Sequence, residues 1–222
     1  MQVVSTSYRA YALDLWGFGD TAHVSTNYTL NQQTLLLDHF LNTMGIGKIA
    51  IVGHGMGALV GMNFAISFPH AVDRVVAVSC PVNFDSVSSR VQASTATDLV
   101  EWLSNRSPEA LLALSDASKA DLQAVITSIS GLRDEDFYAN FQSLNVPTLL
   151  VYGENDPAIT IPDETLSNSM MTHQITLEES GHFPMLDEAM LFNRLLTDFL
   201  ALDSGASPAE LQLKEEWKRR VR

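Results

Sequence analysis

An apolar run that ends in three closely spaced glycines constrains the fold of this chain more than any other feature. Residues 48–52 read Lys-Ile-Ala-Ile-Val, a run typical of a strand buried in a parallel sheet. The run breaks at Gly53-His-Gly-Met-Gly57, and residues 57–68 continue as a helix rich in small residues. Strand, glycine turn and helix in direct succession predict an α/β fold, in which helices flank a mostly parallel sheet.

The rest of the pattern repeats this alternation of strands and helices. Apolar or β-prone runs predict further strands at residues 8–14, 72–79, 147–153 and 174–177. Helical spacing of apolar residues predicts helices at 29–44, with Gly45 as the stop, and at 184–200, and a shorter stretch near 162–170 is helix-like. With 222 residues, of which 46% are hydrophobic, the chain fits a single domain with one sizeable core.

A long segment without a strand candidate separates the two halves of the predicted sheet. Short helical patterns occur in it near residues 99–103, 108–114 and 122–129. We therefore predict a core made of residues 1–81 and 146–201, a helical cap inserted at 82–145, and a charged helical tail at 202–222. The basic cluster at 218–222 is interpreted as the solvated end of a helix rather than a binding patch, because cations suit a helix C-terminus.

The charge and composition limit the classes of partner. A net charge of −13 disfavours binding to nucleic acid and to anionic lipid surfaces. No apolar run reaches the roughly 18 residues that span a bilayer, and the first eight residues lack the features of a signal peptide, so we expect a soluble, cytoplasmic protein. The single cysteine, Cys80, is expected to be a small buried residue. No metal or organic cofactor is implied, because His and carboxylate residues do not cluster at ligand spacing.

The Gly53–Gly57 turn resembles the nucleophile elbow of the α/β-hydrolase family, whose pattern is G-x-S-x-G. Residues 12–20 look like the family's fourth strand and following loop, Gly153-Glu-Asn-Asp-Pro157 like the turn that presents the acid, and Gly181-His-Phe-Pro184 like the histidine loop. The resemblance implies that His182 is the general base and that Asp156 orients its imidazole. Less well placed rivals for the acid are Glu154, Asp163, Asn83 and Asp85.

Two departures from the family pattern bear on function. Gly55 stands at the nucleophile position, and a glycine has no oxygen to attack a carbonyl, although it suits the strained backbone of the elbow. The family's early strands and its oxyanion loop have no counterpart before residue 8, which leaves the Met56 N–H as the remaining oxyanion donor. Residues 10–15 and 48–52 then lack a shared neighbouring strand, so either they pair directly or the sheet has a flaw.

Three functions remain open from the sequence. The first is a hydrolase-family protein related to serine esterases, acting on small ester-type molecules, with acyl-enzyme hydrolysis impaired by Gly55. The second is a non-catalytic binding protein for a small apolar ligand, with His54, Trp16 and Phe18 lining the pocket. The third is catalysis by the His182–Asp156 pair without a serine nucleophile. A chain that folds poorly and is inert is a further alternative, and an unfilled sheet position favours a homo-oligomer.

Overall fold

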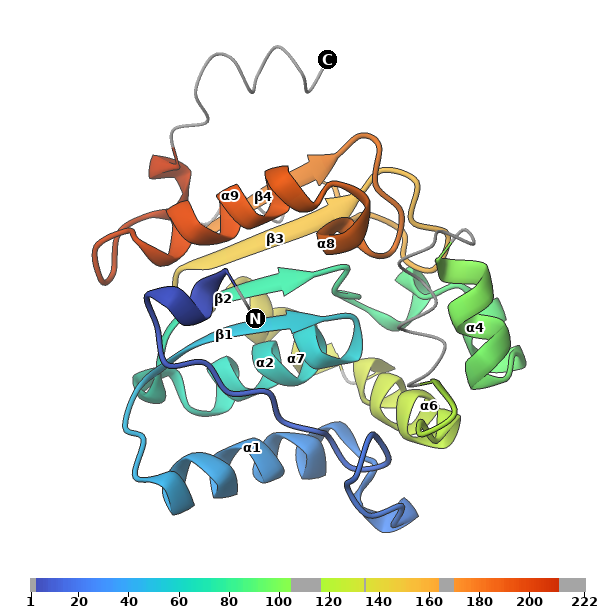
Figure 1. The fold of residues 1–222 in the computed structure, drawn as a ribbon. Helices are drawn as coiled ribbons and strands as arrows, with labels where there is room; N and C mark the ends of the chain where they lie inside the picture. The colour runs from blue at the N-terminus through green and yellow to red at the C-terminus, as the bar shows by residue number, and fades with distance from the viewer. Residues whose placement is uncertain (1–2, 105–116, 134, 164–169, 212–222) are drawn as a thin grey trace.

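Four parallel strands form the centre of the molecule, in the order β1-β2-β3-β4 (Figure 1). The computed structural model describes residues 3–104, 117–133, 135–163 and 170–211. The strands are β1 (Ile49–His54), β2 (Val72–Val78), β3 (Thr148–Gly153) and β4 (Thr172–Leu177), which confirms four of the predicted strands to within two residues. The register pairs His54 with Val78 and Val78 with Val151, so the carboxyl ends of these strands meet at one edge of the sheet.

Helices cover both faces of this sheet. On one face lie α1 (Leu30–Met44) and α2 (Met56–Ser67), and on the other lies α9 (Ala189–Leu200) (Figure 1). The helix α1 begins at Thr29, whose hydroxyl accepts a hydrogen bond from the Gln32 N–H, and it ends at Gly45, which adopts a left-handed φ of 67°. Since α2 packs between the sheet and α1, most of its side chains are buried, as its uniformly small or apolar sequence predicts.

The described residues between β2 and β3 are helical or irregular. They form α3 (Ser89–Ala93), α4 (Ala96–Leu103), α6 (Leu122–Ser130) and α7 (Glu135–Gln142). Figure 1 places α4 and α6 beyond the carboxyl ends of the strands. The helical pattern at 108–114 lies outside the described residues, and the division into a core and a cap at 82–145 stays a prediction. The described residues also form short 3-10 turns: η1 (Val4–Thr6), η2 (Ser25–Asn27), η3 (Pro69–Ala71), η4 (Phe84–Ser86), η5 (Gly131–Arg133) and η7 (Pro208–Glu210).

The strand predicted at residues 8–14 is wrong. Residues 9–15 have no regular secondary structure, and Tyr8 and Tyr11 are each more than 40% exposed. Among the described residues no strand pairs with the outer side of β1, so residues 10–15 and 48–52 do not pair directly and the sheet is open at this edge. A β-prone sequence forms a strand only where a neighbour accepts its backbone hydrogen bonds, and residues 9–15 have no such neighbour.

The helix predicted at 184–200 is divided in the structure. The short α8 (Pro184–Asp187) precedes α9, and Glu188 between them has non-helical angles, φ −124° and ψ 52°. The Glu188 carboxylate accepts hydrogen bonds from the Ser180 hydroxyl and the Glu179 N–H, and these hold the break in place. The predicted helices near 162–170 and at 208–222 fall largely outside the described residues. In the part of the chain that is described, no helix is long and apolar enough to cross a membrane.

Candidate active site

The turn between β1 and α2 has the backbone geometry of a tight elbow. Gly55 adopts φ 51° and ψ −115°, and its N–H donates a hydrogen bond to the Val78 carbonyl over 2.9 Å. At Gly53, an added Cβ would overlap the carbonyl group of Gly57, so the strand and the helix approach too closely for a side chain there. The glycines at 53 and 55 therefore serve two needs, close approach and a left-handed φ.

Asp156 and His182 form a hydrogen-bonded acid–base pair beside this turn. His182 Nδ1 lies 2.9 Å from Asp156 Oδ2, and both side chains are almost fully buried. Burial alone raises the pKa of the Asp156 carboxyl, but the hydrogen bond and charge of His182, with hydrogen bonds from the Ala158 N–H and the Ser79 hydroxyl, outweigh it and lower that pKa below its ordinary value. Asp156 is therefore an ionised acceptor, and it fixes the His182 tautomer with the proton on Nδ1.

The other ring nitrogen of His182 is directed toward the elbow. An ideal Cβ built on Gly55 would lie 3.6 Å from His182 Nε2, and no other described atom beyond the adjacent residues comes within 4 Å of it. A serine hydroxyl at position 55 could thus reach Nε2 at hydrogen-bonding distance, since it extends about 1.4 Å from Cβ. At this distance a hydroxyl-bearing side chain at position 55 could pass a proton to the His182 imidazole.

The loop that carries His182 is anchored on several sides. At Gly153, an added Cβ would overlap the Gly181 carbonyl oxygen, so the end of β3 is pressed against this loop. The Asn155 N–H donates to the Ser180 carbonyl over 2.9 Å, and the Asp187 carboxylate accepts from the Gly181 N–H over 2.8 Å. These contacts join the acid turn, the histidine loop and α8, which places Asp156 and His182 on a fixed frame.

Comparison with known proteins shows the family of this fold. A family model described as the alpha/beta hydrolase family matches residues 3–195. The chain belongs to this family. A protein of Yersinia enterocolitica that bears the name "Putative carbamate hydrolase RutD" is 22% identical over 97% of this chain and 86% of its own length. A RutD protein of Escherichia coli is 23% identical over 90% of this chain and 84% of its own length.

Solved structures of the alpha/beta hydrolase fold resemble the chain over most of its length. The esterase EaEST from Exiguobacterium antarcticum gives a TM-score of 0.76 at 19% identity, covering 90% of this chain and 84% of the esterase. A hydrolase from Pseudomonas aeruginosa gives a TM-score of 0.77 at 18% identity, with coverages of 90% and 83%. These likenesses confirm the predicted fold class.

Two of the predicted residues flank the hydrolase elbow. Met56 is the first residue of α2, so its N–H belongs to the first turn of the helix, where N–H groups lack intrahelical acceptors. His54 is the last residue of β1, and its Nε2 lies 2.7 Å from the His182 carbonyl oxygen. Burial lowers the pKa of His54 to about 3, helped by the charge of His182, so His54 is neutral with its proton on Nε2. Its Nε2 therefore binds the histidine loop rather than facing a ligand.

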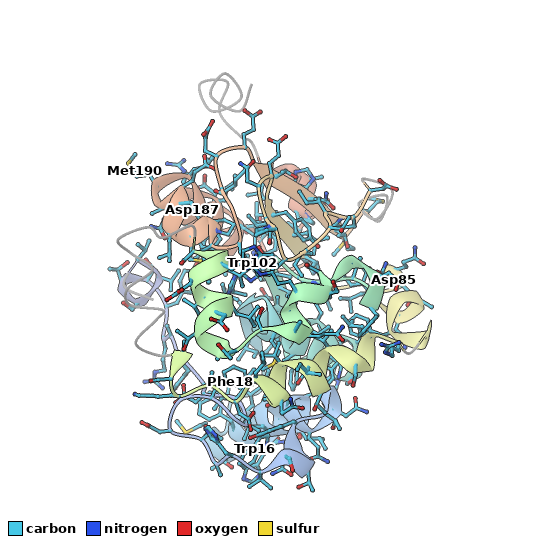
Figure 2. The ribbon with its side chains drawn as sticks, turned by 90° about the vertical axis from the view of Figure 1, so that its right-hand side faces the viewer. Trp16, Phe18, Asp85, Trp102, Asp187 and Met190 are labelled. Carbon is cyan, nitrogen blue, oxygen red and sulfur yellow. The ribbon has the colours of Figure 1, made fainter. Side chains whose placement is uncertain are left out.

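The other two predicted pocket residues, Trp16 and Phe18, lie on the loop that precedes α1. The Trp16 backbone exchanges two hydrogen bonds with the Gln33 side chain, of 2.8 and 2.9 Å, which dock this loop on α1. Figure 2 shows Trp16 beside α1 with Phe18 above it, while Trp102 lies near the middle of the view toward the strand ends. No described hydrogen bond or ring contact joins Trp16 or Phe18 to His182, so their role in a pocket stays a prediction.

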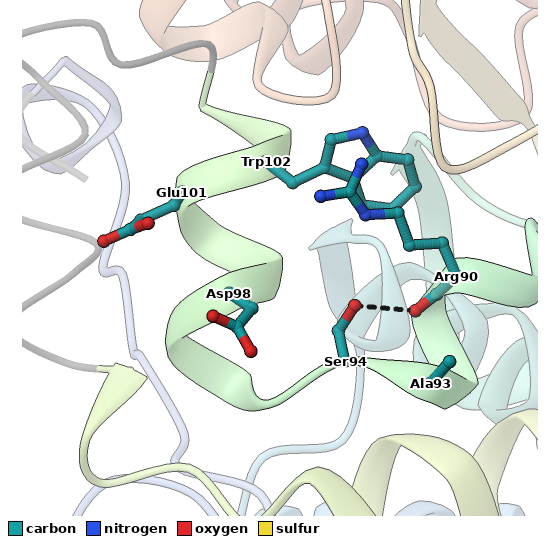
Figure 3. A pocket seen from close by; sticks show the side chains of 6 residues that line it. All are labelled: Arg90, Ala93, Ser94, Asp98, Glu101 and Trp102. Carbon is teal, nitrogen blue, oxygen red and sulfur yellow. Dashed lines mark hydrogen bonds between the residues drawn. The ribbon is translucent and has the colours of Figure 1, made fainter.

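Sequence reasoning missed Trp102 and Ser79. Trp102, on α4, stacks under the Arg90 guanidinium at 4.5 Å, in a hollow of about 410 Å³ that is also lined by Ala93, Ser94, Asp98 and Glu101 (Figure 3). That hollow contains neither Asp156 nor His182.

Ser79, directly after β2, is fully buried and donates to the His182 carbonyl over 3.2 Å. The sequence signal for Ser79 was a polar residue at the carboxyl end of a buried strand. Among the described residues no group of His, Cys, Asp and Glu could hold a metal ion.

Proposed function

We propose that this chain is an alpha/beta hydrolase with a working acid–base pair and no nucleophilic side chain, so that it carries out little or no acyl-enzyme hydrolysis as it stands. The observation that carries the proposal is the 3.6 Å between His182 Nε2 and the Cβ position of Gly55. The base is placed to accept a proton from a side chain that Gly55 does not have. Loss of the nucleophile in a triad removes several orders of magnitude in kcat.

We propose small ester-type molecules as the substrate class of this site. The fold is shared with an esterase, and the curated relatives bear the name "Putative carbamate hydrolase RutD". Esters and carbamates share a carbonyl carbon that a hydroxyl nucleophile attacks, with an oxygen or nitrogen leaving group that His182 could protonate.

The test compares hydrolysis of p-nitrophenyl acetate by the chain and by Gly55→Ser, with Gly55→Ser/His182→Ala as the matched control. We expect Gly55→Ser to raise kcat/KM by about 10²-fold or more and His182→Ala to abolish the gain. No gain in a folded Gly55→Ser variant would overturn the proposal that the acid–base pair is in working order.

The open space beside Gly55 favours a second candidate function. A water molecule there could be deprotonated by His182 Nε2 and attack a carbonyl carbon directly, with the proton then passed to the leaving group. This reaction forms no acyl-enzyme. Slow turnover of activated esters that survives in Gly55→Ala and is lost in His182→Ala would support it. Turnover that persists in His182→Ala would exclude it.

A further inference from the structure

Ser79 has an unusual backbone for a residue with a side chain. It follows β2 directly, its φ is 46°, and among the described residues it is the only non-glycine with a positive φ. Its N–H donates to the Val151 carbonyl over 2.9 Å, which continues the pairing of β2 with β3 by one residue. Non-glycine residues persist in this conformation where the surroundings determine it, and such positions gather at functional sites.

The Ser79 hydroxyl lies between the two members of the acid–base pair. It donates a hydrogen bond to the His182 carbonyl oxygen over 3.2 Å, and it also reaches the Asp156 carboxylate, whose pKa it helps to lower. A hydroxyl has one proton, so it is shared between an anionic oxygen and a main-chain carbonyl. The side chain is fully buried, and water therefore does not compete for either contact.

The His182 residue is thereby held at two places by different groups. Asp156 accepts the hydrogen bond of the ring at Nδ1, whereas the main-chain carbonyl accepts from His54 Nε2 over 2.7 Å and from Ser79. The His54 ring also contacts the His182 ring at a centroid distance of 4.7 Å, but it makes no described hydrogen bond to Asp156, whereas Ser79 reaches both the loop and the acid. Ser79 is thus the group that relates the position of the Asp156 carboxylate to the main chain of His182.

We propose that Ser79 is a positioning residue of this site: its hydroxyl ties the Asp156 carboxylate to the His182 main chain and so directs Nε2 toward position 55. The inference rests on the function proposed above, because it concerns the same base. Ser79 itself is not a nucleophile here, since its hydroxyl contacts the carbonyl oxygen of His182 and not the ring nitrogen that faces the elbow.

The kinetic test uses Gly55→Ser as the parent and adds Ser79→Ala or Ser79→Gly. Both remove the hydroxyl, but glycine accepts the positive φ while alanine does not. We expect kcat to fall about tenfold in both variants with KM within twofold of the parent, as the loss of one buried hydrogen bond to a charged group predicts. A Ser79→Gly variant with full kcat would show that only the backbone conformation matters and would overturn the proposal.

Ser128→Ala is the matched control. Ser128 is also fully buried, and its hydroxyl donates to a main-chain carbonyl, that of Tyr28, over 2.7 Å and away from the acid–base pair. We expect it to lower stability without changing kcat. An equal loss of kcat in Ser128→Ala would mean that the Ser79 effect reports general destabilisation.

A measurement that needs no turnover separates this inference from the proposed function. In the chain with Gly55, proton NMR follows the low-field Nδ1 proton of His182 in its bond to Asp156. We expect that resonance to shift upfield or broaden in Ser79→Gly and to persist in Ser128→Ala. If it moves while Gly55→Ser remains inactive, the proposed function fails and the role of Ser79 stands. If it is unchanged in Ser79→Gly, the role of Ser79 is refuted.

Discussion

At the scale of the residue, the glycine at position 55 stabilises the elbow but provides no nucleophile for hydrolysis. Gly55 combines a φ of 51° with a ψ of −115°, angles that glycine adopts freely and that a side-chain-bearing residue adopts with strain. We expect Gly55→Ser to lower the free energy of unfolding by about 1–3 kcal/mol, even where it raises esterase activity. Urea denaturation measures the change. Gly47→Ala is the control, because Gly47 has open space around it and no positive φ, and an equal loss there would contradict the strain argument.

His54 makes the stability of the fold depend on pH. Burial, with the charge of His182, lowers the pKa of His54 from 6.5 to about 3, so between these values the unfolded chain binds a proton that the folded chain does not. The free energy of unfolding should therefore fall as the pH drops from 6.5 toward 3, by up to about 1.4 kcal/mol per pH unit from this group. His54→Gln, which keeps a donor, should flatten the slope measured by urea denaturation at several pH values. An unchanged slope would show that His54 does not carry it.

At the scale of the element, one buried arginine fastens α9 to β2. Arg74 is only 4% exposed; its Nη1 donates to the Phe199 carbonyl over 2.6 Å and its Nε to Asp73 over 2.7 Å. We expect Arg74→Met to lower the free energy of unfolding by about 2 kcal/mol, because it removes two buried hydrogen bonds of a charged group, while the Phe199 carbonyl keeps the Leu202 N–H and Asp73 keeps Lys48 and Ser204. Arg194→Met is the control: its ion pair with Asp198 is exposed, and its removal should cost less than about 0.5 kcal/mol. Similar losses in the two variants would contradict this.

The strands and helices show which parts of the fold could be predicted from the sequence. The four paired strands were predictable because an apolar run bounded by glycine or proline leaves few other options, although β1 is an edge strand with Val52 exposed and not the fully buried strand that its apolar run indicated. Residues 8–14 are also β-prone, but propensity does not reveal whether a neighbouring strand exists. The break at Glu188 is set by a hydrogen bond to Ser180, a tertiary contact that interrupts a continuous helical pattern. Tertiary contacts of this kind override local periodicity.

The candidate site was predictable to the extent that it follows a local motif. Asp156 and His182 each lie in a short recognisable turn, and the structure joins them by a hydrogen bond of 2.9 Å. Ser79 and Trp102 have no motif, since their relation to the site depends on how β2 ends and on where α4 lies. His54 was predicted to line the pocket. The sequence could not show that its ring binds the His182 carbonyl, because the two residues are 128 positions apart.

At the scale of the whole molecule, the open edge of the sheet and the net negative charge have opposite effects on self-association. Among the described residues no strand covers the outer edge of β1, and Val52 on that strand is 47% exposed. An uncovered edge with an apolar side chain favours pairing between copies of the chain. The net charge of −13 opposes it, and salt screens that repulsion. We therefore expect self-association that increases with protein concentration and with ionic strength, measured by sedimentation velocity.

Val52→Lys tests whether β1 is the surface that pairs. A lysine there adds charge to an exposed position of the edge strand, so we expect the associated fraction to fall at every salt concentration. Met190→Lys is the matched control, since Met190 is 83% exposed on α9 and lies on another element. Both variants change the net charge by the same amount, so a general electrostatic effect would act on them equally. If they reduce association alike, the contact is not at β1; if the parent chain is monomeric throughout, the open edge does not drive assembly.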